Sequence, residues 1–168
     1  MADMATTIYR NETVHTAGEL PTTGSPLPPF TVTLPGLIEL SSDELAGSRL
    51  ILNVFPSIDT GICATSVRRF NEIAASLSNT RVICVSMDLP YALNRFCGAE
   101  GIDHVTTGSA FRSSFGEDFG LTMIDGGMRG LLARAVIVAD VDQTVLHAQL
   151  TPTIHVEPDY EAAIAALG

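Results

Sequence analysis

Short runs in which apolar and polar residues alternate occupy the first quarter of the chain, which is the pattern of half-buried strands. Four such runs precede position 41, at residues 6–10, 13–15, 30–34 and 37–40. The first two predict an N-terminal hairpin and the other two a second pair of strands. Proline, glycine and threonine dominate residues 22–29 and predict an irregular connection between the pairs.

The middle of the chain changes to longer apolar patterns. An apolar run at 49–55 predicts a buried strand, helical spacing predicts a helix from Cys63 to about Leu77, and residues 81–87 predict another strand. Strand, helix and strand in this order form a βαβ unit, whose two strands pair in parallel through a right-handed crossover. The pattern therefore predicts a mixed α/β fold.

The last part of the chain predicts further helices and a strand hairpin. The expected elements are a helix from Pro90 to Gly98 or Gly101, a strand at 105–107, a helix at 109–119, strands at 135–139 and 144–149, and a helix ending at Leu167. Pro158 is expected in the first turn of that last helix, where a missing N–H costs nothing. No repeat or boundary signal divides the chain, so residues 1–168 are expected to form one domain.

A cysteine stands where the strand at 49–55 gives way to the following helix. Residues 56–63 read Pro-Ser-Ile-Asp-Thr-Gly-Ile-Cys, and the turn-forming residues before Cys63 place it at a strand-to-helix corner. In the first turn of a helix, free N–H groups and the helix dipole favour an anion, so a thiol there becomes a nucleophilic thiolate more readily. A small buried hydrophobe is the commoner role of a lone cysteine, but the turn-forming neighbours argue against it.

Several motifs of this chain resemble those of the peroxiredoxins. The Pro-x-x-x-Thr-x-x-Cys spacing resembles their active site, and Asp-Thr-Gly-Ile-Cys-Ala-Thr-Ser-Val-Arg-Arg-Phe is similar to the thiol peroxidase branch, the atypical two-cysteine peroxiredoxins. The similarity extends from about Ala17 through Ser86-Met87-Asp88-Leu89-Pro90, Arg95-Phe96-Cys97-Gly98-Ala99-Glu100-Gly101, Gly130-Leu131-Leu132-Ala133-Arg134-Ala135-Val136 and Glu157-Pro158-Asp159-Tyr160-Glu161.

This resemblance implies a thioredoxin-like fold with an N-terminal β extension and an inserted helix, and a thiolate that reduces hydroperoxides. Such chemistry needs a sulfur anion aligned with the O–O bond, and Cys63 is expected to supply it. The hydroxyl of Thr60 is expected near the thiolate or a peroxide oxygen and also as a helix cap. Pro56 is expected to restrict the loop and shield the site from water.

A cation is also needed to stabilise the leaving oxygen. The residues alone rate Arg68, Arg69 and Arg134 about equally for this task. The resemblance selects Arg134, which stands in an Ala-Arg-Ala-Val string at the start of an apolar strand. A guanidinium suits the role because it stays charged and offers several fixed donors.

A second thiol is needed because an oxidised cysteine, as sulfenic acid, condenses readily with a thiol. Cys84 lies inside an apolar strand and is expected to be inert, whereas Cys97 lies near a helix end that can fray. The resemblance assigns Cys97 as the resolving residue of an intramolecular Cys63–Cys97 disulfide that thioredoxin reduces. A disulfide requires Cα atoms within about 7 Å, so both helices are expected to unwind locally before it closes.

Composition excludes several classes of function. The net charge of −10 opposes nucleic-acid binding, and the absence of lysine excludes a Schiff-base or Walker-type site. The four histidines lack metal-ligand spacing, so no metal or cofactor is expected. Met87, Met123 and Met128 fit core filling, with an apolar pocket or dimer surface as the alternative.

The expected setting is the cytoplasm. No run approaches the roughly 18 apolar residues of a membrane span, no secretory signal opens the sequence, and three cysteines are too few for a disulfide framework. The resemblance further implies a homodimer and, as substrates, alkyl or lipid hydroperoxides beside hydrogen peroxide.

Three other functions compete with a peroxidase. A disulfide oxidoreductase generally needs Cys-x-x-Cys, but Ser66 stands at the second position. Glutathione-peroxidase-like chemistry uses a tryptophan, and the chain has none. A non-catalytic thiol redox sensor on the same fold is the remaining alternative, and turnover distinguishes it because a sensor oxidises once per molecule.

Overall fold

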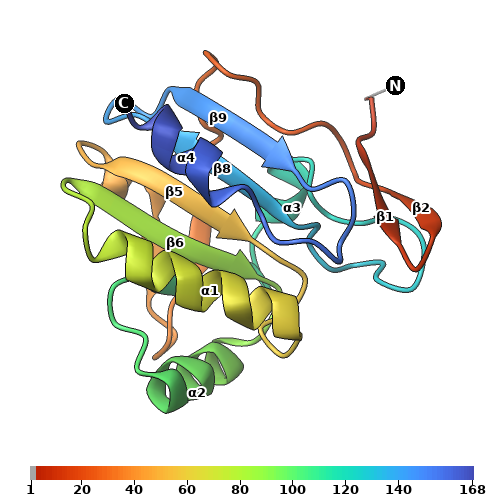
Figure 1. Cartoon of the computed structure of the whole chain (residues 1–168), viewed down its shortest axis with the longest axis horizontal. Coiled ribbons are helices and arrows are strands. Elements are labelled where there is room, and N and C mark those ends of the chain that lie inside the picture. The colour runs from red at the N-terminus through yellow and green to blue at the C-terminus, as the bar shows by residue number, and fades with distance from the viewer. Residues whose placement is uncertain (1–2) are drawn as a thin grey trace.

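The computed structural model describes residues 3–168 as strands and helices arranged around a central sheet (Figure 1). The strands are β1 Thr6–Tyr9, β2 Glu12–His15, β3 Thr31–Thr33, β4 Glu39–Ser41, β5 Arg49–Val54, β6 Thr80–Ser86, β7 Thr106–Ser109, β8 Ala135–Ala139 and β9 Val145–Leu150. The helices are the 3₁₀ helix η1 Ser42–Leu45 and the α-helices α1 Gly61–Ala74, α2 Pro90–Glu100, α3 Phe115–Asp118 and α4 Tyr160–Ala166.

The central sheet has seven strands in the order β4-β3-β7-β6-β5-β8-β9. β5 pairs in parallel with β6 across α1, and β6 pairs in parallel with β7. β8 joins β5 antiparallel and forms a hairpin with β9. The predicted βαβ unit, the C-terminal hairpin and the mixed α/β class are thereby confirmed.

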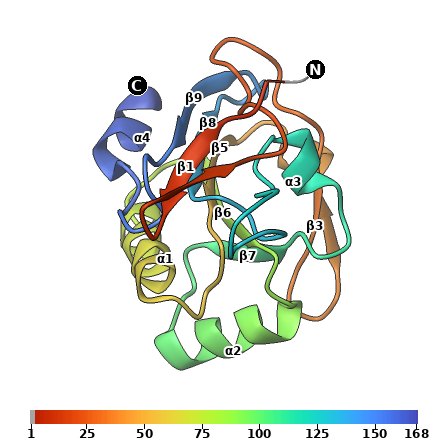
Figure 2. The same cartoon turned by 90° about the vertical axis from the view of Figure 1, so that its right-hand side faces the viewer.

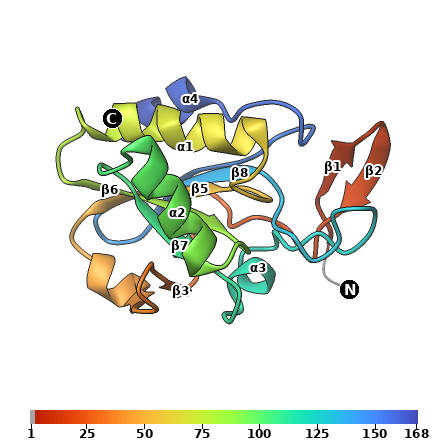
Figure 3. The ribbon, with the colours of Figure 1, turned by 90° about the horizontal axis from the view of Figure 1, so that it is seen from below.

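Helices cover both faces of this sheet. Figure 3 shows α1 and α4 on one side of the sheet and α3 on the other. Leu50 and Leu52 of β5 join the cluster that contains the α3 phenylalanine Phe115, whereas Ile51 joins the cluster that contains Phe70 of α1. Because successive strand residues face opposite sides, burial of both faces explains why β5 is mostly apolar, with Leu50, Ile51, Leu52 and Val54 all buried.

The N-terminal hairpin is also confirmed. β1 and β2 pair antiparallel, with Thr6 opposite His15. The two turn residues, Arg10 and Asn11, both have positive φ values of 52° and 66°, as a two-residue hairpin loop requires. Figure 2 views the molecule from the end where this hairpin lies, in front of the sheet.

Two predicted elements differ from the structure. The helix expected at 109–119 is reduced to α3, because Ser109 still pairs in β7 and residues 110–114 turn before Phe115. The position expected for Pro158 in the first turn of the last helix is wrong. Asp159 is the N-cap of α4 and its side chain accepts a hydrogen bond from Ala162 N at 3.0 Å, so the proline precedes the cap.

Other boundaries shift by a few residues. α1 ends at Ala74 instead of near Leu77. α2 ends at the second of its two predicted stops, where Gly101 adopts the left-handed conformation of a helix C-cap with φ 66°. Within residues 3–168, no helix combines the length and apolar character needed to cross a lipid bilayer.

Candidate active site

Cys63 lies in the first turn of α1, as the sequence predicts. The N-cap is Thr60, whose hydroxyl oxygen accepts a hydrogen bond from Cys63 N at 3.4 Å. The cysteine is fully buried in an apolar cluster with Phe55, Val67 and Leu93. The sulfur is therefore near the positive end of a 14-residue helix and away from bulk water.

Arg134 supplies a positive charge directly beside this sulfur. Its Nη2 lies 3.4 Å from Cys63 Sγ, and the residue is only 1% exposed. The carbonyl oxygen of Ile154 accepts hydrogen bonds from Nε at 3.1 Å and from Nη2 at 3.0 Å, which fixes the guanidinium. A buried, immobilised cation favours the thiolate over the neutral thiol.

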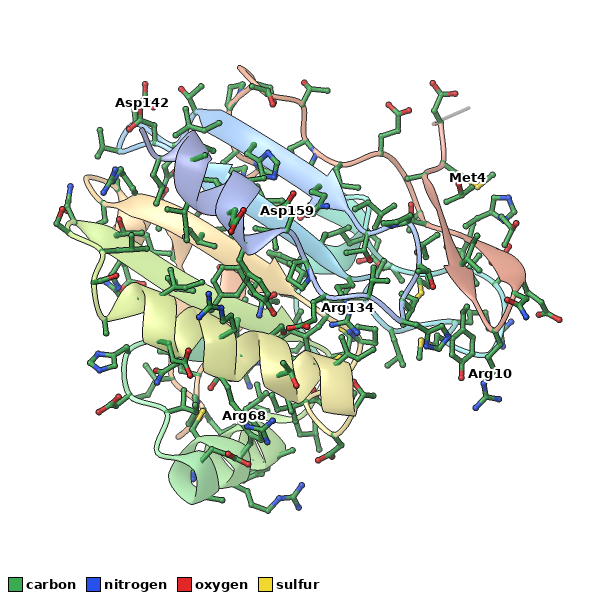
Figure 4. All side chains as sticks on the ribbon, in the orientation of Figure 1. Met4, Arg10, Arg68, Arg134, Asp142 and Asp159 are labelled. Carbon is green, nitrogen blue, oxygen red and sulfur yellow. The ribbon has the colours of Figure 1, made fainter. Side chains whose placement is uncertain are left out.

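The other two candidate arginines lie elsewhere. Arg68 forms an ion pair with Glu100 of α2, with Nη2 and Oε1 2.9 Å apart, and Figure 4 shows it between α1 and α2. Arg69 pairs with Glu72 on the same helix at 3.3 Å. The structure thus brings Arg134, and neither of its two rivals, into contact with the thiol.

A pocket of about 280 Å³ is lined by Arg134, the residue that contacts the Cys63 sulfur, whereas Cys63 itself is fully buried and does not line the pocket. Its lining residues are Pro56, Thr60, Gly61, Ile62, Met128, Arg134, Ile154 and His155. Three of the predicted site residues are therefore in one cavity, next to Cys63. The Nη1 atom of Arg134 is buried and has no hydrogen-bond partner among residues 3–168, so it can donate to an oxygen bound in this pocket.

The loop before Cys63 holds Thr60 in place through Ser57. The Ser57 carbonyl oxygen accepts hydrogen bonds from Thr60 N at 3.2 Å and from the Thr60 hydroxyl at 3.1 Å. The predicted capping role of Thr60 is confirmed. Thr60 is also one of the residues that line the pocket.

Asp88, a residue to which the sequence analysis assigned no role, anchors this loop. Its carboxylate accepts hydrogen bonds from the Ser57 hydroxyl at 2.8 Å, Ile58 N at 2.7 Å and the Ser86 hydroxyl at 2.6 Å. Asp88 stands just before α2, so it joins the segments that lead into the two cysteine-bearing helices. Its position after a buried strand was the available signal, but its loop partners Ser57 and Ile58 lie 31 and 30 residues away.

The other two thiols differ from Cys63 in their surroundings. Cys84 is fully buried in β6, and desolvation raises its pKa to about 12 despite a hydrogen bond from Asn53, so it stays protonated. Cys97 is half-buried in α2, with Sγ 3.6 Å from the Thr107 hydroxyl. Burial raises the Cys97 pKa, and the hydrogen bond with Thr107 opposes that shift. All three cysteines are free thiols.

Residues that sequence reasoning did not select complete the pocket. His155 and Ile154 lie in the segment after β9 and carry no local motif. Met128 lines the cavity, which is the less common of the two uses considered for it, whereas Met123 is a fully buried core residue.

Comparison with known proteins gives the same class of protein that the fold and the buried thiol define. The Redoxin family matches residues 22–164. A thiol peroxidase of Mycobacterium tuberculosis is 54% identical over 165 residues, which cover 98% of this chain and 99% of that protein. A thiol peroxidase of Corynebacterium glutamicum is 54% identical over 164 residues, with the same coverage.

Solved structures agree with this result. A peroxiredoxin-like protein from Aquifex aeolicus superposes with a TM-score of 0.89 at 34% identity, covering 97% of this chain and 96% of that one. A thiol peroxidase from Chromobacterium violaceum gives a TM-score of 0.88 at 18% identity, covering 95% and 93%, and supports the fold.

The chain therefore belongs to the Redoxin family, and its fold is the thioredoxin-like fold of the peroxiredoxins. It is an oxidoreductase with thiol peroxidase activity.

Proposed function

We propose that the chain reduces hydrogen peroxide and organic hydroperoxides with the Cys63 thiolate as nucleophile. The contact between Arg134 Nη2 and Cys63 Sγ, at 3.4 Å and shielded from water, is the observation that carries this assignment. The thiolate attacks one peroxide oxygen, so that an S–O bond forms and the O–O bond breaks. The sulfur is oxidised to sulfenic acid, and the other oxygen leaves as an alcohol or water after taking up a proton.

The pocket offers both hydrogen-bond donors for the peroxide oxygens and apolar groups for the rest of the substrate. Arg134 Nη1 and the Thr60 hydroxyl are the donors available to the two peroxide oxygens, where charge develops as the bond breaks. Pro56, Ile62 and Met128 present apolar groups to the organic part of a hydroperoxide. Pro56 is itself buried and restricts the loop, which excludes water from the sulfur.

Cys97 is proposed as the resolving residue. Its thiolate attacks the sulfenic sulfur, a Cys63–Cys97 disulfide forms, and hydroxide leaves and is protonated to water. A dithiol reductant of the thioredoxin class then reduces this disulfide by thiol–disulfide exchange and is itself oxidised. The high pKa and complete burial of Cys84 oppose its use in either step.

A turnover assay with three cysteine variants tests this cycle. In a thioredoxin-coupled assay with cumene hydroperoxide, Cys63→Ser is expected to lose more than about 10³-fold in rate, because the nucleophile is gone. Cys97→Ser is expected to consume one peroxide per chain and then stop, and Cys84→Ser to cycle at close to the normal rate. Loss of cycling in the Cys84 variant instead of the Cys97 variant would show that the resolving residue is misassigned.

The same assay distinguishes a peroxidase from a thiol redox sensor. A sensor consumes one equivalent of peroxide per chain, whereas the proposed enzyme consumes many. The homodimer and the cytoplasmic location implied by the family resemblance remain part of the proposal. Light scattering on the purified chain and fractionation of cells that express it test them separately.

A further inference from the structure

The N-terminal hairpin contacts both segments that form the mouth of the pocket. Among the lining residues, Arg134, which contacts Cys63 Sγ, is buried and marks the inner end, whereas Met128 is half-buried and His155 is exposed. Met128 belongs to the loop between α3 and β8, and His155 to the segment between β9 and α4. In Figures 1 and 3 the β1–β2 hairpin lies beside the α3–β8 loop, at the end of the sheet.

The hairpin is attached to the His155 segment by backbone hydrogen bonds and a ring contact. Ile8 N donates to Pro152 O at 3.2 Å, and Ile8 O accepts from Ile154 N at 2.9 Å. The ring of Tyr9 stacks on the imidazole of His155, with centroids 5.6 Å apart and planes inclined by 25°. Arg10 N, at the hairpin turn labelled in Figure 4, lies 3.4 Å from His155 Nε2.

A second set of contacts attaches the hairpin to the Met128 loop. The Asp125 carboxylate accepts a hydrogen bond from His15 N at 2.9 Å and lies 2.7 Å from His15 Nδ1. Ile124 N donates to His15 O at 2.9 Å. The Tyr9 ring packs so closely under this loop that a Cβ added at Gly127 would lie 3.3 Å from Tyr9 Cε1. Tyr9 therefore contacts both segments of the mouth.

We propose that the hairpin, through Tyr9, holds His155 and Met128 in position, and that these two side chains select hydroperoxides by their organic group. This inference rests on the proposed peroxidase function and assigns specificity within it. Tyr9 is a positioning residue, because it acts through His155 and the Met128 loop.

The size of the pocket explains why the two ends have different tasks. Hydrogen peroxide is only slightly larger than water, which takes up about 30 Å³, so it fills a small part of a cavity of about 280 Å³. Its two oxygens need only the donors at the inner end. An alkyl or aryl hydroperoxide has a further apolar group, which extends toward the thioether of Met128 and the ring of His155. These contacts contribute to binding for organic hydroperoxides and not for hydrogen peroxide.

The test compares the two substrates in variants of the full chain. The ratio of kcat/KM for cumene hydroperoxide to kcat/KM for hydrogen peroxide is expected to fall about tenfold in His155→Ala and in Tyr9→Ala, since small apolar contacts in a substrate pocket have effects of this size. Tyr9→Phe keeps the ring and is expected to keep the normal ratio. Ile38→Ala, an exposed apolar residue of the other N-terminal hairpin, is the matched surface control.

The outcomes separate this inference from the proposed function. A ratio that stays constant in His155→Ala and Tyr9→Ala, whether both rates fall together or neither falls, overturns the specificity role and leaves the peroxidase intact. A wild-type chain that reduces neither substrate refutes the proposed function itself, and the inference with it. Because His155 is exposed, its variant keeps the test decisive even if Tyr9→Ala fails to fold.

Discussion

The two helices that carry the proposed redox pair are held to the rest of the molecule very differently. α1 buries six residues, Cys63, Ala64, Ser66, Val67, Phe70 and Ile73, against the sheet. α2 has 11 residues against the 14 of α1, but buries only Pro90 and Leu93. Cys63 has a fixed cationic neighbour, whereas Cys97 is half-buried beside a threonine. From this comparison we expect Cys63 to stay in place for the proposed reaction with peroxide, and α2 to do most of the moving when the proposed disulfide closes.

The largest effect is expected on the oxidation of Cys63, when the guanidinium of Arg134 is removed. Arg134→Met is expected to lower the second-order rate of Cys63 oxidation by about 100-fold, the effect of losing one donor to a developing oxyanion. Single-turnover oxidation by hydrogen peroxide measures this rate, and circular dichroism checks that the variant folds. Arg69→Gln is the control, because Arg69 is exposed and its partners, Glu72 and the Tyr160 ring, do not include the thiol. Equal effects of the two substitutions would show that Arg134 is not the cation that promotes oxidation of Cys63.

Weakening the loop anchor should have a smaller effect on the same step. Asp88→Asn is expected to slow Cys63 oxidation about tenfold, since a carboxylate hydrogen bond contributes roughly 1.5–3 kcal/mol and positions Ser57 and Ile58. Asp59→Asn is the matched control, because Asp59 lies in the same loop but pairs only with Arg95 at 3.5 Å, on the surface.

Asp88 positions the loop before Cys63, so its substitution should change the rate of Cys63 oxidation without slowing disulfide closure. In Asp88→Asn the oxidation of Cys63 is expected to slow while the later closure of the disulfide proceeds at its normal rate or faster. A variant that only melts at a lower temperature, with both rates unchanged, would contradict a role in positioning the thiol.

The smallest expected effect is on the rate of disulfide closure, and it comes from the ion pair that holds α2 to α1. Glu100 links α2 to Arg68 of α1, and Arg68 also lies over the Phe96 ring at 5.6 Å. Because an exposed ion pair contributes little to stability, Glu100→Gln is expected to speed closure of the proposed disulfide only about twofold. Rapid quenching followed by mass spectrometry measures the closure rate. Glu72→Gln is the control, since its partner Arg69 is on the same helix.

The pH dependence of this link has a definite sign. The hydrogen bond from Arg68 lowers the pKa of the Glu100 carboxyl. A lowered pKa in the folded state means that the link is complete above the ordinary carboxyl pKa and is lost as the pH falls through the lowered value. The contribution of Glu100 to the closure rate should therefore be constant from pH 6 to 9, and the Glu100→Gln difference should disappear only in acid. A Glu100→Gln difference that varies with pH across the neutral range would contradict this assignment.

Local signals predicted most of the framework and the place of the thiol. The turn residues before Cys63, the helical spacing after it and the cap at Thr60 all lie within a few positions of one another, so the sequence contains the information directly. Contacts between segments that are distant in the sequence could not be predicted from such local signals. Arg134 is 71 residues from Cys63, and its choice over Arg68 and Arg69 depended on the family resemblance.

The mouth of the pocket could not be predicted for the same reason. Arg10 and His155 are 145 residues apart, and nothing near either residue indicates that they meet. The helix expected at 109–119 failed because Ser109 finds partners on two neighbouring strands, which outweigh its local helical pattern. Pro158 lies outside α4 for a local reason, because Asp159 is the N-cap and its side chain accepts a hydrogen bond from Ala162 N.

Peptide mapping by mass spectrometry after one equivalent of hydrogen peroxide tests the division between a fixed and a mobile thiol most directly. The account predicts a single intramolecular disulfide between Cys63 and Cys97, with Cys84 still a free thiol. Hydrogen exchange on the same sample should show protection lost mainly at 93–100 and less at 61–66. A Cys63–Cys84 disulfide, or a Cys63–Cys97 disulfide with unchanged protection in both helices, would contradict it.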